Sequence, residues 1–299
     1  MFFVIGASGF IGKHLYDYCR KKRIDVIGTY CRHKCYSELI KFDMCADDFR
    51  DLCHEHMDGG GAHAVIICGA NASIDSCKKD EEASYDLNVS AIKRIIEQAD
   101  EMGIKSVFLS SEAVFDGKQG MYAEDAEPNP ITVYGRQKLQ IEQYMIHNLN
   151  NYLIFRISRA TGSSYGEKDI FNEFYHKIIN NEDIICLKNQ SFCLTEIGDV
   201  VEGIVKALQH GLIGLYHLSS ANYISRYELA HLYVQKIFGS YEKIFEKEYN
   251  DISFLDNRHI YGGLKGDKLA DLLGIHYMDM ESILNKYSTT YKARSGITE

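Results

Sequence analysis

The chain has 299 residues, of which 45% are hydrophobic and 25% charged, as in an ordinary globular protein. This length suffices for one large α/β domain or for a large domain with a smaller second one. The net charge of −9 argues against a nucleic-acid partner, which usually requires a basic surface. No apolar run reaches about eighteen residues, and the first predicted strand starts at Phe2, so we expect a cytoplasmic protein without a membrane partner.

The nine cysteines are scattered and odd in number, so we expect reduced thiols. Cys31 and Cys35, with the cysteine and histidines of residues 53–56, offer a zinc site as an alternative. However, no second clean cysteine pair supports that spacing, and Arg32 and Lys34 would repel a cation. The sequence therefore predicts no metal site.

Strand-like apolar runs alternate with helical patterns through the first half of the chain. This alternation predicts an α/β fold with a Rossmann-type, doubly wound parallel sheet. The expected strands span residues 2–5, 25–30, 64–68, 106–109 and 152–156. The expected helices span residues 12–22, 84–102 (ending at Gly103), 133–148, 171–180, 197–209, 225–237 and 268–273.

A glycine-rich segment, Gly6-Ala7-Ser8-Gly9-Phe10-Ile11-Gly12, directly follows the first strand and opens a helix. Peptide N–H groups and the helix dipole can there face a pyrophosphate without side-chain obstruction. The alternative is a tight turn that needs glycine only for its backbone angles. We expect a bound dinucleotide, with contacts from Gly6, Ser8, Gly9, Phe10, Ile11 and Gly12.

The second strand ends at a basic residue, Arg32, where an NAD-binding chain often has an acidic one. Arg32 can pair with a 2′-phosphate, which favours NADP over NAD, although a solvated loop arginine is the alternative. Asp43 follows the next apolar segment and can accept a hydrogen bond from adenine, or else cap a helix.

The dinucleotide-binding domain is expected over residues 1–160, with a segment near residues 190–210 returning to it. Residues 161–299 then form mainly a smaller substrate-binding domain. Only two prolines occur and no Ser/Gly-rich linker, so we expect the C-terminal domain to be interwoven with the first.

Tyr134 and Lys138 lie four residues apart in a predicted helix, which places phenol and ammonium on one face. A phenol titrates at about pH 10, and Lys138 with an oxidised nicotinamide can lower that value. Tyr134 could then donate a proton to a carbonyl oxygen while hydride reaches its carbon. Ser111 follows a predicted strand at the sheet's carboxyl end and could hydrogen-bond the same oxygen; the alternative is a turn cap.

These segments resemble the extended short-chain dehydrogenase/reductases, and among them most of all the dTDP-4-dehydrorhamnose reductases. The resemblance covers nearly the whole chain, through GASGFIG at 6–12, SSEAVFDG at 110–117, YGRQKL at 134–139, and the segments 189–195 and 258–269. It implies a catalytic set of Ser111, Tyr134 and Lys138. The tyrosine and lysine would also touch the cofactor.

The resemblance implies further contacts. Gly69 and Ala70 match a loop that passes the cofactor, and Asn88 matches a helix asparagine of the superfamily. Substrate contacts fall on Glu112, Gln190, Thr195 and Arg258. Arg258 could clamp the substrate pyrophosphate, or form a structural salt bridge.

Three positions depart from the family pattern. Phe192 replaces a glycine where the nucleotide-sugar lies, Ala113 replaces a tyrosine, and His259 replaces a proline. The catalytic residues persist while the substrate-facing ones change, which indicates a related nucleotide-sugar reaction with an altered substrate.

The leading hypothesis is an NADP-dependent reductase of a keto group on a nucleotide-linked sugar, for deoxysugar or surface polysaccharide synthesis. A nucleotide-sugar epimerase or dehydratase is the second, although Ala113 provides no second acid/base group for dehydration. The third is a non-catalytic cofactor-binding regulatory subunit, as in the similar β subunit of methionine adenosyltransferase. A homodimer is compatible with the sequence, which does not fix the oligomeric state.

Overall fold

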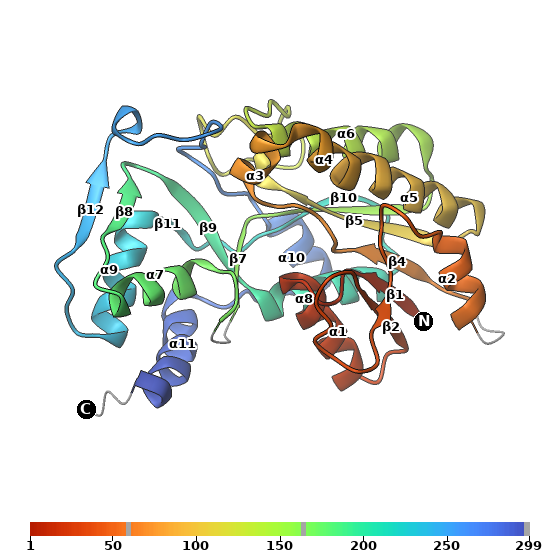
Figure 1. Cartoon of the computed structure of the whole chain (residues 1–299), viewed down its shortest axis with the longest axis horizontal. Coiled ribbons are helices and arrows are strands. Elements are labelled where there is room, and N and C mark those ends of the chain that lie inside the picture. The colour runs from red at the N-terminus through yellow and green to blue at the C-terminus, as the bar shows by residue number, and fades with distance from the viewer. Residues whose placement is uncertain (58–60, 163–165, 296–299) are drawn as a thin grey trace.

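A seven-stranded sheet lies at the centre of the protein, with helices on both faces (Figure 1). The computed structural model describes residues 1–57, 61–162 and 166–295, and of residues 292–295 only the backbone. The strand order is β3-β2-β1-β4-β5-β6-β10, and every neighbouring pair is parallel. The α/β Rossmann-type fold is therefore confirmed, with β10 as an added edge strand. The strands are β1 (Phe2–Ile5), β2 (Val26–Tyr30), β3 (Ile40–Lys41), β4 (Ala64–Ile67), β5 (Lys105–Ser111), β6 (Tyr152–Ile157) and β10 (Gly214–Leu218).

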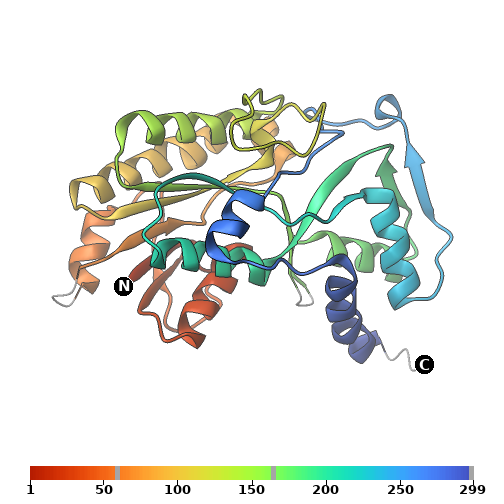
Figure 2. The same cartoon turned by 180° about the vertical axis from the view of Figure 1, so that it is seen from behind.

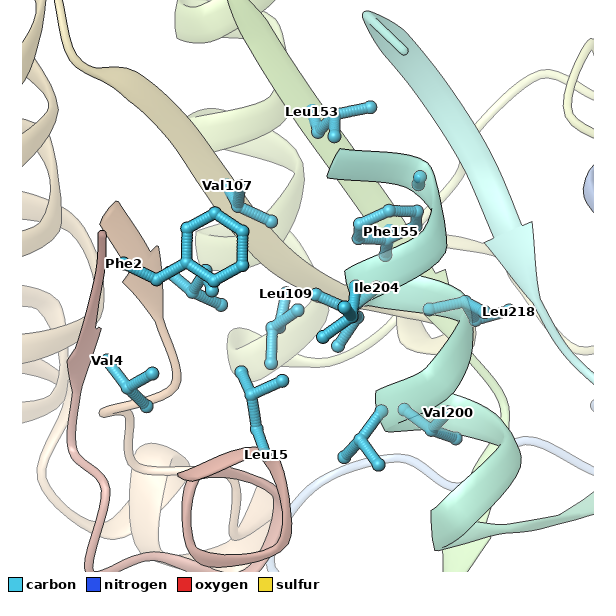
Figure 3. Packing of buried hydrophobic residues seen from close by; sticks show 14 of the residues in the cluster. Phe2, Val4, Leu15, Val107, Leu109, Leu153, Phe155, Val200, Ile204 and Leu218 are labelled. Carbon is cyan, nitrogen blue, oxygen red and sulfur yellow. The ribbon is translucent and has the colours of Figure 1, made fainter. Parts of the chain in front are cut away.

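All four residues of β1 are apolar and buried, which is typical of a strand that is covered on both faces. Phe2 and Val4 belong to one core cluster, whereas Phe3 and Ile5 belong to another on the opposite face. Figure 3 shows the first cluster, where Leu15 and Ile204 project from two helices toward the strands. That face is covered by α1 (Phe10–Lys21) and α8 (Ile197–Gln209), and the other by α2 (Phe49–His56), α5 (Ile92–Glu101) and α6 (Val133–Asn148).

A second lobe lies beside the carboxyl end of the large sheet (Figure 2). It has its own aromatic core. Tyr233, Tyr287 and Tyr291 are fully buried in it. Helix α8 and strand β10 leave this lobe and join the large sheet, so the lobes share the chain. The boundary near residue 160 stays a prediction. The elements of the lobe are β7 (Arg159–Thr161), α7 (Ile170–Ile179), β8 (Ile184–Leu187), β9 (Ser191–Glu196), β11 (Tyr223–Ser225), α9 (Arg226–Ile237), β12 (Ile244–Lys247) and α11 (Met280–Ser295).

The long helix expected at residues 84–102 is interrupted. It consists of α4 (Glu81–Tyr85), a π-helical stretch η1 (Asp86–Ala91) and α5. The wider π turn carries Asn88, whose buried side chain bonds groups outside the helix. The periodicity of the sequence could not reveal this change of pitch.

Several short elements escaped the sequence patterns because a few residues carry no readable period. They include β3, α2 and the short strands of the second lobe. Helix α11 was missed as well, although its buried tyrosines recur at four-residue spacing. The remaining missed elements are β10, α3 (Ile74–Lys79), η2 (Glu112–Val114) and η3 (Tyr249–Asp251). The expected helix near residue 270 is α10 (Asp267–Leu273).

No helix within the described ranges has both the length and the apolar character required to cross a bilayer.

A buried ion pair fastens helix α6 to the large sheet. Arg156 of β6 donates from Nη2 to Glu142 Oε2 of α6 at 2.7 Å and from Nε to Oε1 at 3.0 Å. Ser110 donates its hydroxyl to the same carboxylate. Neither charged side chain is more than 4% exposed, so each depends on the other to offset its loss of hydration.

We predict that Arg156→Met lowers the free energy of unfolding by about 3–5 kcal/mol, because Glu142 is left buried without its partner. Arg156→Met combined with Glu142→Leu should recover part of this loss, since the unpaired charge is removed as well. Urea unfolding monitored by circular dichroism measures both. Arg50→Met, which breaks an exposed pair with Asp48, is the control and should change stability little. An Arg156→Met protein as stable as the wild type would contradict the prediction.

Candidate active site

The turn between β1 and α1 is so close-packed that only glycine fits at its key positions. Gly6 has a φ of +83°, and a Cβ added there would lie 2.7 Å from the amide nitrogen of Gly69. A Cβ on Gly12 would lie 2.3 Å from the carbonyl oxygen of Gly6. The Gly6 N–H donates to Thr29 Oγ1 at 3.0 Å, which ties the turn to β2.

Helix α1 begins directly after this turn, at Phe10, with Gly9 as a cap that has no side chain. The first N–H groups of a helix have no intrahelical partner and carry partial positive charge. Acidic side chains are absent from the first turn of α1, so nothing there would repel an anion. The backbone shape and the donors of residues 6–12 fit a pyrophosphate.

Arg32 and Asp43 lie where the sequence places them, just past the ends of β2 and β3. Arg32 is exposed, which leaves its guanidinium accessible. Asp43 accepts a hydrogen bond from the Cys45 N–H at 2.9 Å and so closes a turn. The alternative role of Asp43 as a helix cap is wrong, because Asp48 caps α2 through the Arg50 N–H.

Gly69 and Ala70 form the loop after β4 beside the glycine turn. The side chain of Asn88 holds the next residue of this loop, Asn71, by two hydrogen bonds. Asn88 accepts from the Asn71 N–H at 2.8 Å and returns a hydrogen bond to the Asn71 carbonyl at 2.9 Å. It also donates to Gln137 of α6 at 2.8 Å. The π-helical residue therefore links this loop to the helix that carries Tyr134.

Ser111, Tyr134 and Lys138 come together where α6 meets the end of β5. Gly135 permits this approach, because a Cβ there would lie 2.1 Å from the carbonyl oxygen of Ala113. Lys138 donates from Nζ to the Leu109 carbonyl at 2.8 Å, and the same nitrogen is 5.7 Å from the ring centroid of Tyr134. The structure thus brings the three predicted catalytic side chains into one site.

Burial controls the protonation of this site. It raises the pKa of the Tyr134 phenol, and contact with the Ser111 hydroxyl opposes that shift only in part. Burial lowers the pKa of Lys138 to about 8, although the charge of Glu142 pulls it upward. Burial is the largest influence on the pKa of Tyr134, and Lys138 is not among the groups that shift it. A lower pKa of Tyr134 through Lys138 and an oxidised nicotinamide together stays a prediction.

A loop from the far end of the chain caps the amino terminus of α6. Asp256 accepts from the Val133 N–H at 2.8 Å, beside the local cap in which Thr132 accepts from the Gly135 N–H at 2.9 Å. Asn257 donates to the Ile131 carbonyl at 3.0 Å. No sequence pattern predicts this contact, since the partners lie more than a hundred residues apart.

The predicted substrate residues divide into two groups. Glu112 accepts from the Gly263 N–H at 2.6 Å, and Gln190 donates to the His259 carbonyl at 3.2 Å, so both lie where the second lobe meets β5. Arg258 forms an ion pair with Asp75 at 2.7 Å, which matches the structural alternative.

Thr195 does not reach the substrate side. Its side chain is fully buried, and its hydroxyl bonds Ser158 Oγ and the Ser220 N–H, both at 2.9 Å. Thr195 therefore supports the junction of the lobes, and its expected contact with substrate is not one that this structure allows.

Phe192 is also buried, within the core of the second lobe, at 2% exposure. The ring therefore packs inside the second lobe.

This combination of fold and site defines a dinucleotide-dependent oxidoreductase of the extended short-chain dehydrogenase/reductase class. The chain belongs to the RmlD substrate binding domain family, whose model matches residues 1–291. The resemblance read from the sequence motifs is thereby confirmed.

Three individual relatives share between 21% and 28% of their residues with this chain. The chain is 28% identical to the probable low-salt glycan biosynthesis reductase Agl14 of Haloferax volcanii over 232 residues, which cover 75% of each protein. It is 25% identical to the methionine adenosyltransferase 2 subunit beta of Xenopus tropicalis, over 76% of this chain and 69% of that one. The dTDP-4-dehydrorhamnose reductase of Bacillus anthracis, solved in complex with NADP, superposes with a TM-score of 0.82 at 21% identity over 98% of each chain.

We predict a pH-dependent difference in stability between the wild type and Lys138→Met. The pKa of Lys138 falls from 10.5 to about 8 on folding, so between these values the unfolded chain binds one more proton than the folded protein. The free energy of unfolding of the wild type should then rise with pH across that window, by about 2–3 kcal/mol relative to Lys138→Met. Urea unfolding of both proteins from pH 7 to 10.5 measures it, and parallel curves would exclude the shifted pKa.

Proposed function

We propose that this protein reduces a keto group on a nucleotide-linked sugar with NADPH. The observation that carries the proposal is the set of Ser111 with the buried Tyr134 and Lys138 at the carboxyl edge of the sheet, beside a glycine turn shaped for a pyrophosphate. The similarity to a glycan biosynthesis reductase and to dTDP-4-dehydrorhamnose reductases supports the sugar substrate. Such a reaction would supply a deoxysugar or polysaccharide pathway in the cytoplasm.

Each catalytic residue has a separate task. Tyr134 donates the phenolic proton to the oxygen of the ketone, and Ser111 holds that oxygen by a hydrogen bond. Lys138 keeps its ammonium beside Tyr134 through the Leu109 carbonyl and is free to bind a ribose hydroxyl with its other protons. Because Tyr134 and Lys138 are nearly inaccessible to solvent, water competes little for these hydrogen bonds.

The dinucleotide would be held by residues 6–12, Arg32, Asp43 and the loop at Gly69 and Ala70. When bound, reduced nicotinamide supplies the hydride. The exposed Arg32 after β2 can meet a 2′-phosphate, which favours NADP, with NAD as the alternative.

A non-catalytic regulatory subunit is the second candidate, because the β subunit of methionine adenosyltransferase is among the relatives. The intact Ser-Tyr-Lys set favours catalysis. A protein that only binds its cofactor has no use for a buried proton donor, and burying the Tyr134 hydroxyl beside Ser111 brings it no gain.

We predict that Tyr134→Phe lowers kcat/KM for NADPH oxidation by at least about 100-fold, because the proton donor is lost. The affinity for NADPH should change far less than turnover, because the glycine turn and the other cofactor contacts are kept. Stopped-flow absorbance with dTDP-4-dehydrorhamnose and other nucleotide 4-keto sugars measures turnover, and fluorescence titration measures cofactor binding.

The matched control is Tyr144→Phe on the same helix, whose hydroxyl donates to Glu97 outside the site and should not affect turnover. A wild-type protein that binds NADPH yet reduces none of the sugars would contradict the proposed function and favour the regulatory candidate.

A further inference from the structure

Arg159 lies at the catalytic edge of the large sheet, although no motif of the sequence singled it out. Strand β6 pairs with β5 so that Ile157 lies opposite Ser111. Arg159 follows two residues later and begins β7, where it pairs with Leu194 of β9. The side chain therefore originates at the junction of the two lobes, next to the serine of the catalytic set.

The guanidinium of Arg159 is held over an aromatic ring but is not saturated with hydrogen bonds. Its Cζ lies 4.6 Å from the ring centroid of Phe192. Its Nε is buried, and no described residue accepts a hydrogen bond from it. A buried donor without an acceptor is costly and uncommon in native proteins, so this one requires an explanation.

Among the residues that the structure describes, no carboxylate forms an ion pair with Arg159, although Glu112 and Glu173 both attract it. Arg226, which repels it, donates from Nη2 to Glu173 at 2.6 Å and is thereby neutralised. Glu112 attracts Arg159 but accepts its hydrogen bond from the Gly263 N–H. Glu112 and Arg159 thus face the same junction without closing into an ion pair.

The chemistry of these two side chains restricts what can lie between them. A guanidinium only donates hydrogen bonds, and an ionised carboxylate only accepts them. A hydroxyl accepts from the first and donates to the second, whereas a keto oxygen cannot donate and a phosphate would be repelled by Glu112. Hydroxyl groups are what a sugar ring presents.

We propose that Arg159 and Glu112 jointly bind a ring hydroxyl of the sugar, and that Arg159 is a specificity-determining residue for the sugar moiety. This inference rests on the proposed function, because it assumes a sugar at Ser111. The contact of the Arg159 guanidinium with the Phe192 ring supports this position of the side chain, which gives the bulky residue of the substrate loop a role.

The test separates recognition of the sugar from recognition of the nucleotide. Isothermal titration with dTDP-rhamnose and with dTDP, and with UDP-glucose and UDP, gives the gain in affinity that the sugar provides. In Arg159→Met this gain should fall about tenfold, since a hydrogen bond to a charged group is lost, while affinities for the bare nucleotides and NADPH stay unchanged. Arg226→Met removes the neighbouring charge and is the matched control, with no expected change in the gain.

Three outcomes would overturn the inference. If the wild type reduces a nucleotide 4-keto sugar but the sugar gain is unchanged in Arg159→Met, the role of Arg159 is contradicted and the proposed function is not. An equal loss of affinity for dTDP and dTDP-rhamnose assigns Arg159 to the nucleotide instead. A wild type that binds none of the four ligands and turns over no keto sugar contradicts both the inference and the proposed function. Unchanged thermal unfolding and NADPH affinity of Arg159→Met exclude misfolding as the cause of any loss.

Discussion

The packing of helix α6 against strands β5 and β6 is the contact on which the site depends. Tyr134, Lys138 and Glu142 recur every four residues, so they share one face of α6. Lys138 reaches the Leu109 carbonyl, and Glu142 reaches Ser110 and Arg156. A single helical face therefore carries the proton donor, the cation and the buried ion pair. Any shift of α6 along the sheet would disrupt the chemistry and the anchor together.

This arrangement carries a cost in stability. Burial opposes the ionisation of both Tyr134 and Lys138, which are nearly inaccessible before any ligand binds. Groups optimised only for stability would instead be apolar at these positions. The Nε of Arg159 also lowers stability, because it is buried and no described residue accepts a hydrogen bond from it. A ligand that supplies an acceptor would remove this cost.

Contacts between the lobes complete the site. The segment that carries Asp256 and Arg258 comes from near the end of the chain, yet it caps α6 and pairs with Asp75 of α3. A few residues later Gly263 donates to Glu112. The catalytic helix and the substrate side are therefore held by one returning segment, which couples the position of the second lobe to that of Tyr134.

The sequence by itself determined the features that depend on local spacing. The alternation of strand-like runs with helical patterns predicted a Rossmann-type parallel sheet, the glycine turn at residues 6–12 predicted a pyrophosphate site, and the four-residue spacing of Tyr134 and Lys138 predicted a shared face. Each follows from backbone geometry over a few residues, and the observed strand order and helix α6 agree with them. The tertiary structure alone decided which polar residues face one another across the lobes. It buried Thr195 and Phe192, paired Arg258 with Asp75, and left Arg159 facing Glu112 without an ion pair. These outcomes depend on the docking of segments far apart in the chain, which no local pattern encodes.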